Sequence, residues 1–395
     1  MTLITTNDKR FKEDVVGKKA YNIHLLQKHG FPTLRGLVLK PPISDGEYLQ
    51  AWNYFSPNPV LAVRSSMLNE DGSITSMAGK FETVLGVQTL DDFKRAVEKV
   101  VASADTPSES SVFIQPMCDS HISGVLFTRT SPNNNFAYIE STYGLGETIV
   151  GGKIAPDRFL INIKTNEIEK KISPLKFFGI FLEKTTLELG EIINYSFGTA
   201  RKVSSMGKGR YFSSIPYQER KKASLTETQL QQLVKLATEI ERSFGCPQDI
   251  EFAIENDSIL ILQTRPITSY LHLETLSMNV SKSNETRLSG MIASPGEVVG
   301  IVISDFEKED EILEPFIYVG FETRPELLYH LDKVIGIVTE SGGLLSHASI
   351  VSRELNIPCL VSVAGALSTL KQGERIRLNA TEGYIERGVI HQPKN

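Results

Sequence analysis

The sequence predicts an α+β protein with more than one domain. The chain has 395 residues, and at about 150 residues per domain this length predicts two or three domains. Segments with strand-like alternation and segments with helical periodicity follow one another along the chain. Residues 269–286 interrupt them, because they lack clear periodicity and include the polar run Ser281-Lys282-Ser283-Asn284. We expect this stretch to be a linker between residues 1–268 and residues 287–395.

Composition and charge exclude several classes of protein. Lys and Arg number 42 against 47 Asp and Glu, and this net charge of −5 argues against a general nucleic-acid binder. Apolar residues make up 41% and charged residues 23%, as in folded globular proteins. No apolar run approaches about 18 residues and the N-terminus lacks a signal-peptide pattern, so we expect neither a membrane span nor secretion. The three cysteines form no disulfide framework, which predicts a reduced, cytoplasmic protein.

The part before the linker mixes helix and strand signals. Helices are expected from Gly17 to Leu26, at Leu90–Ala102 and at Thr226–Phe244. A polar loop of small residues at 69–79 is too long for a plain turn, and loops of this kind are often functional. The expected strands in this part are Leu37–Lys40, Val60–Arg64, Ser111–Pro116, Gly124–Thr128 and Phe136–Glu140.

The part after the linker has short strands around one helix. The helix is expected at Ser346–Leu355. The expected strands are Phe316–Gly320, Val334–Thr339, Pro358–Val361, Arg375–Leu378 and Gly383–Glu386.

A glycine pair followed by a serine and a histidine, Gly342-Gly343-Leu344-Leu345-Ser346-His347, is the sharpest signal of chemistry. Ser346 is a good N-cap for a helix that begins at His347. A helix N-terminus presents N–H groups and the positive end of the dipole, which suit a phosphoryl group. The same field disfavours imidazolium, so a histidine there tends to stay neutral and nucleophilic. The pattern suits a phosphohistidine, and it is equally compatible with a histidine that merely begins a helix.

A hairpin expected within residues 249–266 is the second signal. If residues 256–258 form a three-residue loop, Glu251 lies directly opposite Gln263 on one face of the sheet. An acid beside an amide oxygen could hold Mg²⁺, with Arg265 two residues further on for phosphate. A two-residue loop would instead put Glu251 and Gln263 on opposite faces, and polar residues on a solvent-facing hairpin are common.

A third segment, Leu61–Ser66, ends a strand in Arg-Ser-Ser and leads through a glycine-containing loop to Thr83. Such a segment could present the Arg64 guanidinium and backbone donors to a triphosphate. It matches neither a Walker motif nor a dinucleotide fingerprint. By itself it does not define a site.

Taken together and in this order, these segments resemble the phosphoenolpyruvate synthase, pyruvate phosphate dikinase and rifampin phosphotransferase family. The resemblance implies an ATP-grasp domain with two lobes, roughly residues 1–115 and 116–268, followed by a swivelling β/β/α phosphohistidine domain at residues 287–395. Residues 269–286 would act as the hinge. The matching elements are Gly17–Ile23, Ala62–Thr83, Ser123–Thr128, Ile139–Glu147, Pro156-Asp157, Asp249–Thr268, Ser294–Gly296 and Gly342–Ala348.

The resemblance also implies roles for individual residues. Lys19 and two arginines would contact the phosphates, Gln115 would line the nucleotide pocket, and the loop containing Gly79 would cover the phosphates. Glu251 and Gln263 would bind Mg²⁺. The residues implied to bind ATP are Lys19, Arg64, Gly79, Thr83, Gln115, Glu251, Gln263 and Arg265. The residues implied to act in catalysis are His347, Arg64 and Arg265.

The reaction that the resemblance implies is a double transfer from ATP. The β-phosphoryl group would pass to His347 and AMP would leave, while the γ-phosphate goes to water or phosphate. Metal and cations would neutralise charge so that a neutral imidazole can attack in line.

The sequence departs from the family pattern at several points. Lys18 replaces the second glycine of the opening element, and Leu345 stands where dikinases usually have Thr. About twenty residues separate Lys40 from Leu61, where relatives usually insert a helical subdomain.

The largest departure is that no part of the sequence is left to form an acceptor domain. A pyruvate-binding barrel needs roughly 250 residues, whereas the two assigned parts leave eighteen. We therefore expect the barrel to be absent and its catalytic cysteine to have no counterpart among Cys118, Cys246 and Cys359.

Our main hypothesis is an ATP-dependent phosphotransferase of the dikinase type that passes the phosphoryl group of phospho-His347 to a small-molecule acceptor. The sequence does not name that acceptor. A second hypothesis is a ligase in which the same phosphoryl transfer activates a carboxylate. A third is a nucleotide sensor without activity, or a charging subunit whose partner protein supplies the acceptor site. The presence of the phosphate-binding and metal-binding residues argues against the inactive sensor, and it leaves the partner protein open.

Overall fold

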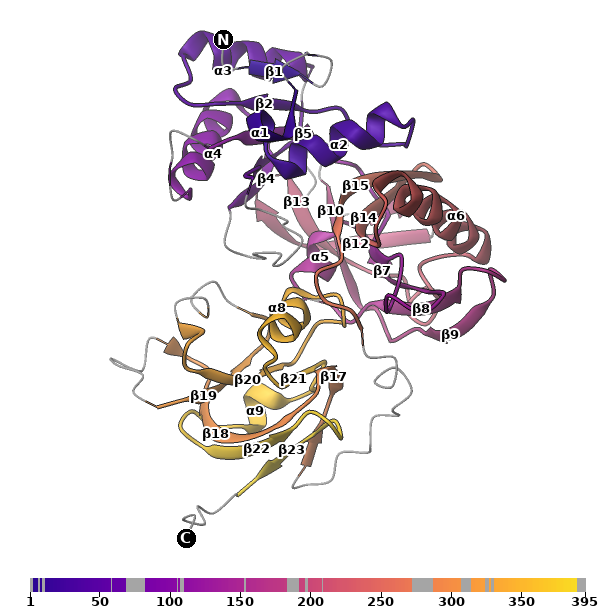
Figure 1. Cartoon of the computed structure of the whole chain (residues 1–395), viewed down its shortest axis with the longest axis vertical. Helices are drawn as coiled ribbons and strands as arrows, with labels where there is room; N and C mark the ends of the chain where they lie inside the picture. The colour runs from indigo at the N-terminus through magenta and orange to yellow at the C-terminus, as the bar shows by residue number, and fades with distance from the viewer. Residues whose placement is uncertain are drawn as a thin grey trace. The chain divides into compact units, whose positions relative to one another are not determined.

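Figure 1 shows the chain as a computed structural model. It describes residues 3–5, 8, 11–57, 59–68, 82–104, 106, 110–152, 154–182, 192–195, 198–207, 209–271, 287–306, 314–323, 327 and 330–388, of which 192–195 and 198–207 by their backbone alone. The chain divides into two units. Unit 1 comprises Met1–Arg129, Asn135–Glu147 and Asp157–Thr268, and unit 2 comprises Thr130–Asn134, Thr148–Pro156 and Ser269–Asn395.

The helices expected from the sequence are present in the structure. The expected helices within residues 17–26, 90–102, 226–244 and 346–355 are confirmed as α2, α4, α6 and α8, and α3 fills the short stretch between Lys40 and Leu61. No helix in the described ranges is both long and apolar enough to cross a membrane. The helices are α1 (Glu13–Val16), α2 (Lys18–Lys28), α3 (Asp45–Tyr54), α4 (Leu90–Ala102), α5 (Glu147–Val150), α6 (Glu227–Phe244), α8 (His347–Leu355) and α9 (Ala366–Thr369).

A five-stranded antiparallel sheet forms the first part of unit 1, in the order β1-β2-β5-β3-β4. Apolar side chains such as Val63 and Ile114 pack one face of this sheet against α3 and α4. Because side chains alternate along a strand, Arg64 and Gln115 lie on the other face. The strands are β1 (Leu3–Thr5), β2 (Leu37–Leu39), β3 (Leu61–Ser65), β4 (Thr83–Val87) and β5 (Val112–Pro116).

The start of α2 is fixed to the end of β3 through Gly17 and Ser66. Gly17 has φ +77°, and a Cβ atom there would lie 2.0 Å from the carbonyl oxygen of Ser66, so only glycine fits. The Ser66 hydroxyl donates to Val16 O at 2.8 Å and accepts from the backbone N–H of Ala20 at 3.0 Å. These contacts bring the first turn of α2 next to the strand that carries Arg64.

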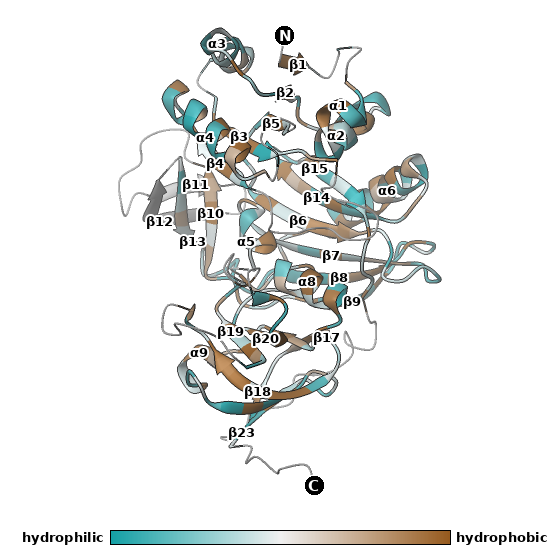
Figure 2. Ribbon diagram, turned by 60° about the vertical axis from the view of Figure 1, so that its left-hand side comes forward, coloured by the Kyte–Doolittle hydropathy of each residue, from teal (hydrophilic) through white to brown (hydrophobic). Residues whose placement is uncertain are grey.

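A six-stranded antiparallel sheet, in the order β15-β14-β6-β7-β8-β9, forms the second part of unit 1. Ile250, Phe252 and Ile254 of β14 pack with the apolar side of α6 in one core, and Figure 2 shows hydrophilic and hydrophobic residues on different sides of that helix. Glu251 therefore lies on the sheet face away from α6. The strands are β6 (Ile122–Phe127), β7 (Phe136–Tyr143), β8 (Asp157–Asn162), β9 (Ile168–Ile172), β14 (Gln248–Glu255) and β15 (Ser258–Pro266).

A four-stranded sheet that the sequence did not predict completes unit 1. Its order is β10-β13-β12-β11. A buried ion pair supports it, because Lys176 Nζ lies 2.6 Å from Asp157 Oδ1 and neither side chain is exposed. Asp157 belongs to the Pro-Asp element noted in the sequence, so that element has a structural role here. The strands are β10 (Phe178–Leu182), β11 (Ile192–Tyr195), β12 (Gly198–Gly207) and β13 (Arg210–Ser214).

Unit 2 is built on an eight-stranded sheet in the order β16-β23-β22-β18-β19-β20-β21-β17. The pairs β18–β19, β19–β20 and β20–β21 are parallel, and the others are antiparallel. Only Gly290 separates the first strand of this order from the last, so the sheet curls until its edges meet. The strands are β16 (Arg287–Ser289), β17 (Met291–Ser294), β18 (Glu297–Ile303), β19 (Phe316–Gly320), β20 (Val334–Thr339), β21 (Cys359–Val361), β22 (Arg375–Asn379) and β23 (Tyr384–Arg387).

Candidate active site

The turn of the β14–β15 hairpin differs from the sequence prediction. Glu255 pairs with Ser258, so the turn contains two residues, Asn256 and Asp257, and not three. Both have positive φ angles, +47° and +61°, as two-residue turns of this type require. The expected three-residue loop is therefore wrong.

A β-bulge restores the pairing that the wrong loop had predicted. The register of the short turn continues to Phe252, which pairs with Ile261, and Leu262 is then the extra residue of β15. Beyond this bulge Glu251 pairs with Gln263. The predicted pairing of an acid with an amide is thus confirmed, for a different physical reason, because one inserted residue offsets the shorter turn.

Arg64 of β3 reaches this pair from the five-stranded sheet. Its Nη1 atom lies 3.5 Å from Gln263 Oε1 and 4.0 Å from Glu251 Oε2. The Arg64 and Glu251 side chains are only 20% and 26% exposed, and Arg64 Nε is buried without a hydrogen-bond partner among the described residues. The Arg64 guanidinium thus lies beside one carboxylate oxygen and one amide oxygen, and it has unused donor capacity.

A second arginine lies two residues further along the hairpin. Arg265 Nε donates to Asp249 Oδ2 at 2.9 Å, and the two side chains are 16% and 7% exposed. Because Asp249 and Arg265 pair across the strands two residues from Glu251 and Gln263, all four share one sheet face. The carboxylate limits the positions that the guanidinium can take.

The remaining residues predicted to bind ATP lie on elements around this cluster. Thr83 pairs directly with Arg64, and the buried Gln115 lies on the same sheet face, its amide 3.4 Å from Leu34 O. Lys19 is in the first turn of α2 and is 8% exposed; its helix contacts β15 through a hydrogen bond from Asn22 Nδ2 to Thr264 O at 2.8 Å. Gly79 lies outside the described residues.

The ligands available for a metal ion suit Mg²⁺ bound together with a nucleotide. Glu251 and Gln263 offer one carboxylate and one amide oxygen on the same face. No group of three or more His, Cys, Asp and Glu side chains that could hold a metal occurs in the described part of the chain. Mg²⁺ is typically held by one or two protein oxygens and completes its shell with water and substrate phosphates. The pair fits that mode of binding.

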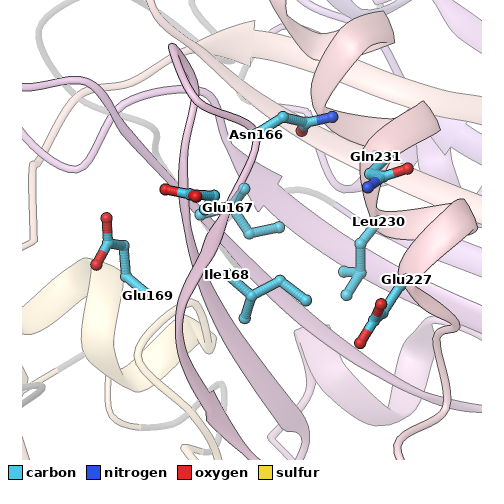
Figure 3. Close-up of a pocket in the computed structure, with 8 residues that line it drawn as sticks. Asn166, Glu167, Ile168, Glu169, Glu227, Leu230 and Gln231 are labelled. Atoms are coloured by element: carbon cyan, nitrogen blue, oxygen red, sulfur yellow. The ribbon is translucent and has the colours of Figure 1, made fainter.

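A hollow of about 490 Å³ between the β8–β9 hairpin and α6 is a different feature (Figure 3). Ile161, Ile168 and Leu230 line it with polar residues such as Glu227 around them. It lies on the α6 side of the six-stranded sheet, whereas Glu251 lies on the other side. None of the described residues predicted to bind ATP lines it.

In unit 2, α8 begins at His347 with Ser346 at the N-cap, as the sequence predicted. Ser346 has the extended backbone of an N-cap, φ −68° and ψ 159°, but its side chain makes no capping hydrogen bond. The hydroxyl instead donates to Gly343 O at 2.8 Å. The Ser346 side chain therefore leaves the first N–H groups of the helix uncapped.

Thr323 contacts the histidine, and sequence reasoning missed it. Thr323 Oγ1 lies 3.0 Å from His347 Nδ1, although the residues are 24 positions apart. The loop that carries Thr323 is held by Tyr318, whose hydroxyl donates to Glu322 O at 2.8 Å. Because β19 and β20 are parallel neighbours, the loops that follow them meet at one edge of the sheet. A predicted β19–β20 pairing would have pointed to this contact.

The cysteines take no part in either site. No disulfide links Cys118, Cys246 and Cys359. Burial raises the pKa of the Cys359 thiol to about 12, although the Ser352 hydroxyl and the Arg353 charge act in the opposite direction. A thiol with so high a pKa is not a nucleophile near neutral pH.

Two family models match the chain. Residues 46–108 and 104–285 match the model described as the pyruvate phosphate dikinase AMP/ATP-binding domain. Residues 312–383 match the mobile domain of PEP-utilising enzymes. The first match covers Arg64 and the β14–β15 hairpin, and the second covers Thr323 and His347.

Several known proteins are similar to this chain over most of its length. A probable phosphoenolpyruvate synthase of Pyrococcus horikoshii is 32% identical over 355 residues, which are 84% of this chain and 41% of that protein. The phosphoenolpyruvate synthase of Pyrococcus furiosus is 33% identical, again over 84% of this chain and 41% of the relative. That of Neisseria meningitidis is 28% identical over 90% of this chain and 48% of the relative. The chain thus spans less than half the length of these relatives.

Proposed function

The chain belongs to the phosphoenolpyruvate synthase and pyruvate phosphate dikinase family, with an ATP-grasp domain followed by a PEP-utiliser domain, and we propose that it is a dikinase-type phosphotransferase. In this proposal ATP gives its β-phosphoryl group to His347 and leaves as AMP, and the γ-phosphate goes to water or phosphate. The observation that carries the proposal is the contact of Arg64 with Glu251 and Gln263. That contact supports the proposal because a cation that binds phosphate and two side chains that bind Mg²⁺ would have to lie next to one another.

The side chains on the hairpin face would bind and neutralise the triphosphate. Arg64 and Arg265 supply positive charge, and the Asp249 carboxylate holds the Arg265 guanidinium in place. Glu251 and Gln263 would hold Mg²⁺, which when bound supplies charge neutralisation at the phosphate oxygens. Lys19 would add a third cation from α2.

His347 would act as the nucleophile through Nε2. Attack requires a lone pair on Nε2, so the ring proton must be on Nδ1, from which it donates to Thr323 Oγ1. The bond from Nε2 to the β-phosphorus forms as the bond from that phosphorus to the AMP oxygen breaks. Water or phosphate attacks the γ-phosphorus, whose bond to the oxygen that bridges it to the β-phosphorus breaks, so that the β-phosphoryl group alone stays on His347. Thr323 can hold the same ring nitrogen before and after the transfer.

The two sites belong to different units, so the transfer requires an arrangement of the units in which His347 reaches the nucleotide. We propose that residues 269–286 are the hinge that permits this arrangement. The same hinge would carry the phosphorylated histidine to an acceptor site. Of this segment the structure describes residues 269–271.

The acceptor is proposed to be a small molecule whose identity is open. Because the chain matches less than half of its relatives' length, the acceptor site would come from a further segment or from a partner protein. If a partner protein supplies the acceptor site, this chain would be the subunit of a split phosphoenolpyruvate synthase-like enzyme that takes the phosphoryl group from ATP. A cytoplasmic location, as predicted from the sequence, is part of the proposal.

The nucleotide product tests the proposal. The chain is incubated with ATP and Mg²⁺, nucleotides are separated, and acid-labile phosphoprotein is measured in the same samples. We expect AMP and phosphoprotein in the wild type and neither in His347→Ala. ADP without AMP, or undiminished acid-labile phosphoprotein in His347→Ala, would contradict the proposal.

A further inference from the structure

Four successive peptide carbonyls before His347 each accept a hydrogen bond from a side chain. The donors come from the end of β20, from α8 and its N-cap, and from the residue after β21, so the loop is attached to three elements. We call these donors the carbonyl-binding set: Thr339, Ser346, Ser349, Arg353 and Ser362. The contacts are Thr339 Oγ1 to Ser341 O (2.7 Å), Ser362 Oγ to Gly342 O (2.6 Å), Ser346 and Ser349 Oγ to Gly343 O (2.8 and 2.7 Å), and Arg353 Nη1 to Leu344 O (2.8 Å).

The carbonyl-binding set is mostly buried. Thr339, Ser346 and Ser349 are at most 2% exposed, and Arg353 is 7% exposed. Hydrogen bonds in such surroundings are stronger than in water, and a carbonyl left without its donor there is costly. The set therefore determines the conformation of the loop, including Gly342 at φ +104°.

Holding the carbonyls also orients the peptide dipoles. In a trans peptide the C=O and N–H bonds point in opposite directions. Each carbonyl that is held by the set thus turns the N–H of the following residue away from the donor. The negative ends of four consecutive dipoles are bound, and their positive ends face the other way.

Ser346 shows that this arrangement takes precedence over ordinary helix capping. A serine at an N-cap usually accepts a hydrogen bond from the first turn of the helix. Here its hydroxyl is used by the loop, donating to Gly343 O and lying 3.2 Å from Ser349 Oγ. The positive end of α8 is consequently left to act on the group at His347.

Arg353 extends the set beyond the loop. Its Nη1 also lies 3.5 Å from Ala293 O of β17, and its Nε lies 3.4 Å from Ser269 Oγ at the start of the proposed hinge. One buried guanidinium thus contacts the histidine loop, the edge strand β17 and the start of the proposed hinge.

We propose that the carbonyl-binding set consists of positioning residues that stabilise the phosphorylated form of His347 by fixing the dipoles of the loop. This inference rests on the proposed function, because it concerns the same histidine. It goes beyond that function by naming residues that touch neither nucleotide nor metal. The chemical group stabilised is the phosphoryl group on the imidazole, an anion.

The test measures the lifetime of phosphohistidine in the full chain. The protein is phosphorylated with phosphoramidate, a small phosphoryl donor, so that charging does not depend on ATP. Thr339→Val keeps the shape of the side chain and removes its hydroxyl. We expect the phosphohistidine of this variant to hydrolyse about 10-fold faster than that of the wild type. Thr339→Ser, which keeps the hydroxyl, should restore the lifetime.

A matched control and a second variant keep the result interpretable. Ser368→Ala removes a hydroxyl of the same unit that donates to Gly365 O at 3.0 Å and not to a carbonyl of the histidine loop, and should leave the lifetime unchanged. Ser362→Ala serves if Thr339→Val does not fold. Equal lifetimes in the wild type and in folded Thr339→Val and Ser362→Ala would overturn the inference. Failure of ATP alone to charge the wild type would overturn the proposed function and leave this test intact.

Discussion

On the β14–β15 hairpin the candidate site consists of charged and amide side chains on paired strands, whereas the loop before His347 is held by hydroxyl groups and the Arg353 guanidinium, which donate to its peptide carbonyls. In the hairpin, cross-strand pairing places Glu251 with Gln263 and Asp249 with Arg265. In the loop, the carbonyl-binding set fixes a backbone that carries no charge of its own. From this difference we infer two ways of stabilising the negative charge of one phosphoryl group. Opposite charges would compensate it at the nucleotide, and oriented peptide dipoles would stabilise it at the histidine.

Removing a charge from the hairpin should have the largest effect. Glu251→Gln keeps the size of the side chain and removes the carboxylate that would bind Mg²⁺. We expect AMP formation to fall roughly 100-fold or more. The control is Glu255→Gln on the same strand and face, whose carboxylate accepts a backbone N–H from Asp119 at 3.0 Å. Similar rates for the two variants would show that Glu251 is not a metal ligand.

Removing a neutral contact at the histidine should have a smaller effect. Thr323→Val removes the partner of Nδ1 and should lower the rate of histidine phosphorylation about 10-fold, the worth of one hydrogen bond. Thr323→Ser should recover most of the rate. The rate of phosphoprotein formation at saturating ATP distinguishes the two variants. A loss in Thr323→Ser as large as in Thr323→Val would mean that shape, and not the hydroxyl, is required.

The two regions also differ in how far the sequence could predict them. His347 at the start of a helix follows from a local pattern of glycines and an N-cap serine. The partner Thr323 depends on which strands are neighbours in the eight-stranded sheet, and periodicity within single strands does not contain that information. The carbonyl-binding set could not be predicted from periodicity either, because buried serines and threonines have no distinctive spacing.

The hairpin illustrates another limit. Its charged residues were predicted because acids, amides and arginines are rare in apolar strands, and the alternation of faces follows from strand geometry. The bulge at Leu262 could not be predicted, since every residue in the run Ile259-Leu260-Ile261-Leu262 suits a regular strand. The pairing was therefore right although the turn length was wrong.

The reactivity of one cysteine beside each region reports how accessible that region is to solvent. Cys246 is half-buried next to Gln248 at the start of β14, and Cys359 is buried beside α8. The Cys359 pKa is raised from 9.0 to about 12, so the folded state keeps the proton that the unfolded state loses. The stabilisation from this thiol is complete below pH 9 and is lost as the pH rises toward 12. At pH 9 we expect iodoacetamide to modify Cys246 and not Cys359 in the native protein, as peptide mass spectrometry would show.

The smallest expected effect concerns the hairpin turn. Asp257 has φ +61°, a conformation that glycine adopts more easily. Asp257→Gly should therefore raise the free energy of unfolding by about 0.5 kcal/mol, whereas Asp257→Ala should not. Urea unfolding measures both. A decrease with glycine would argue against the two-residue turn.

The origin of the phosphoryl group on His347 tests the central proposal most directly. Separate samples receive ATP labelled at the β-phosphorus or at the γ-phosphorus, and the acid-labile label on the protein is counted after the reaction is complete. We predict β-label on the wild type, none on His347→Ala, and γ-label only in released phosphate or pyrophosphate. Retention of γ-label on His347 with formation of ADP would show an ordinary kinase and contradict the dikinase mechanism.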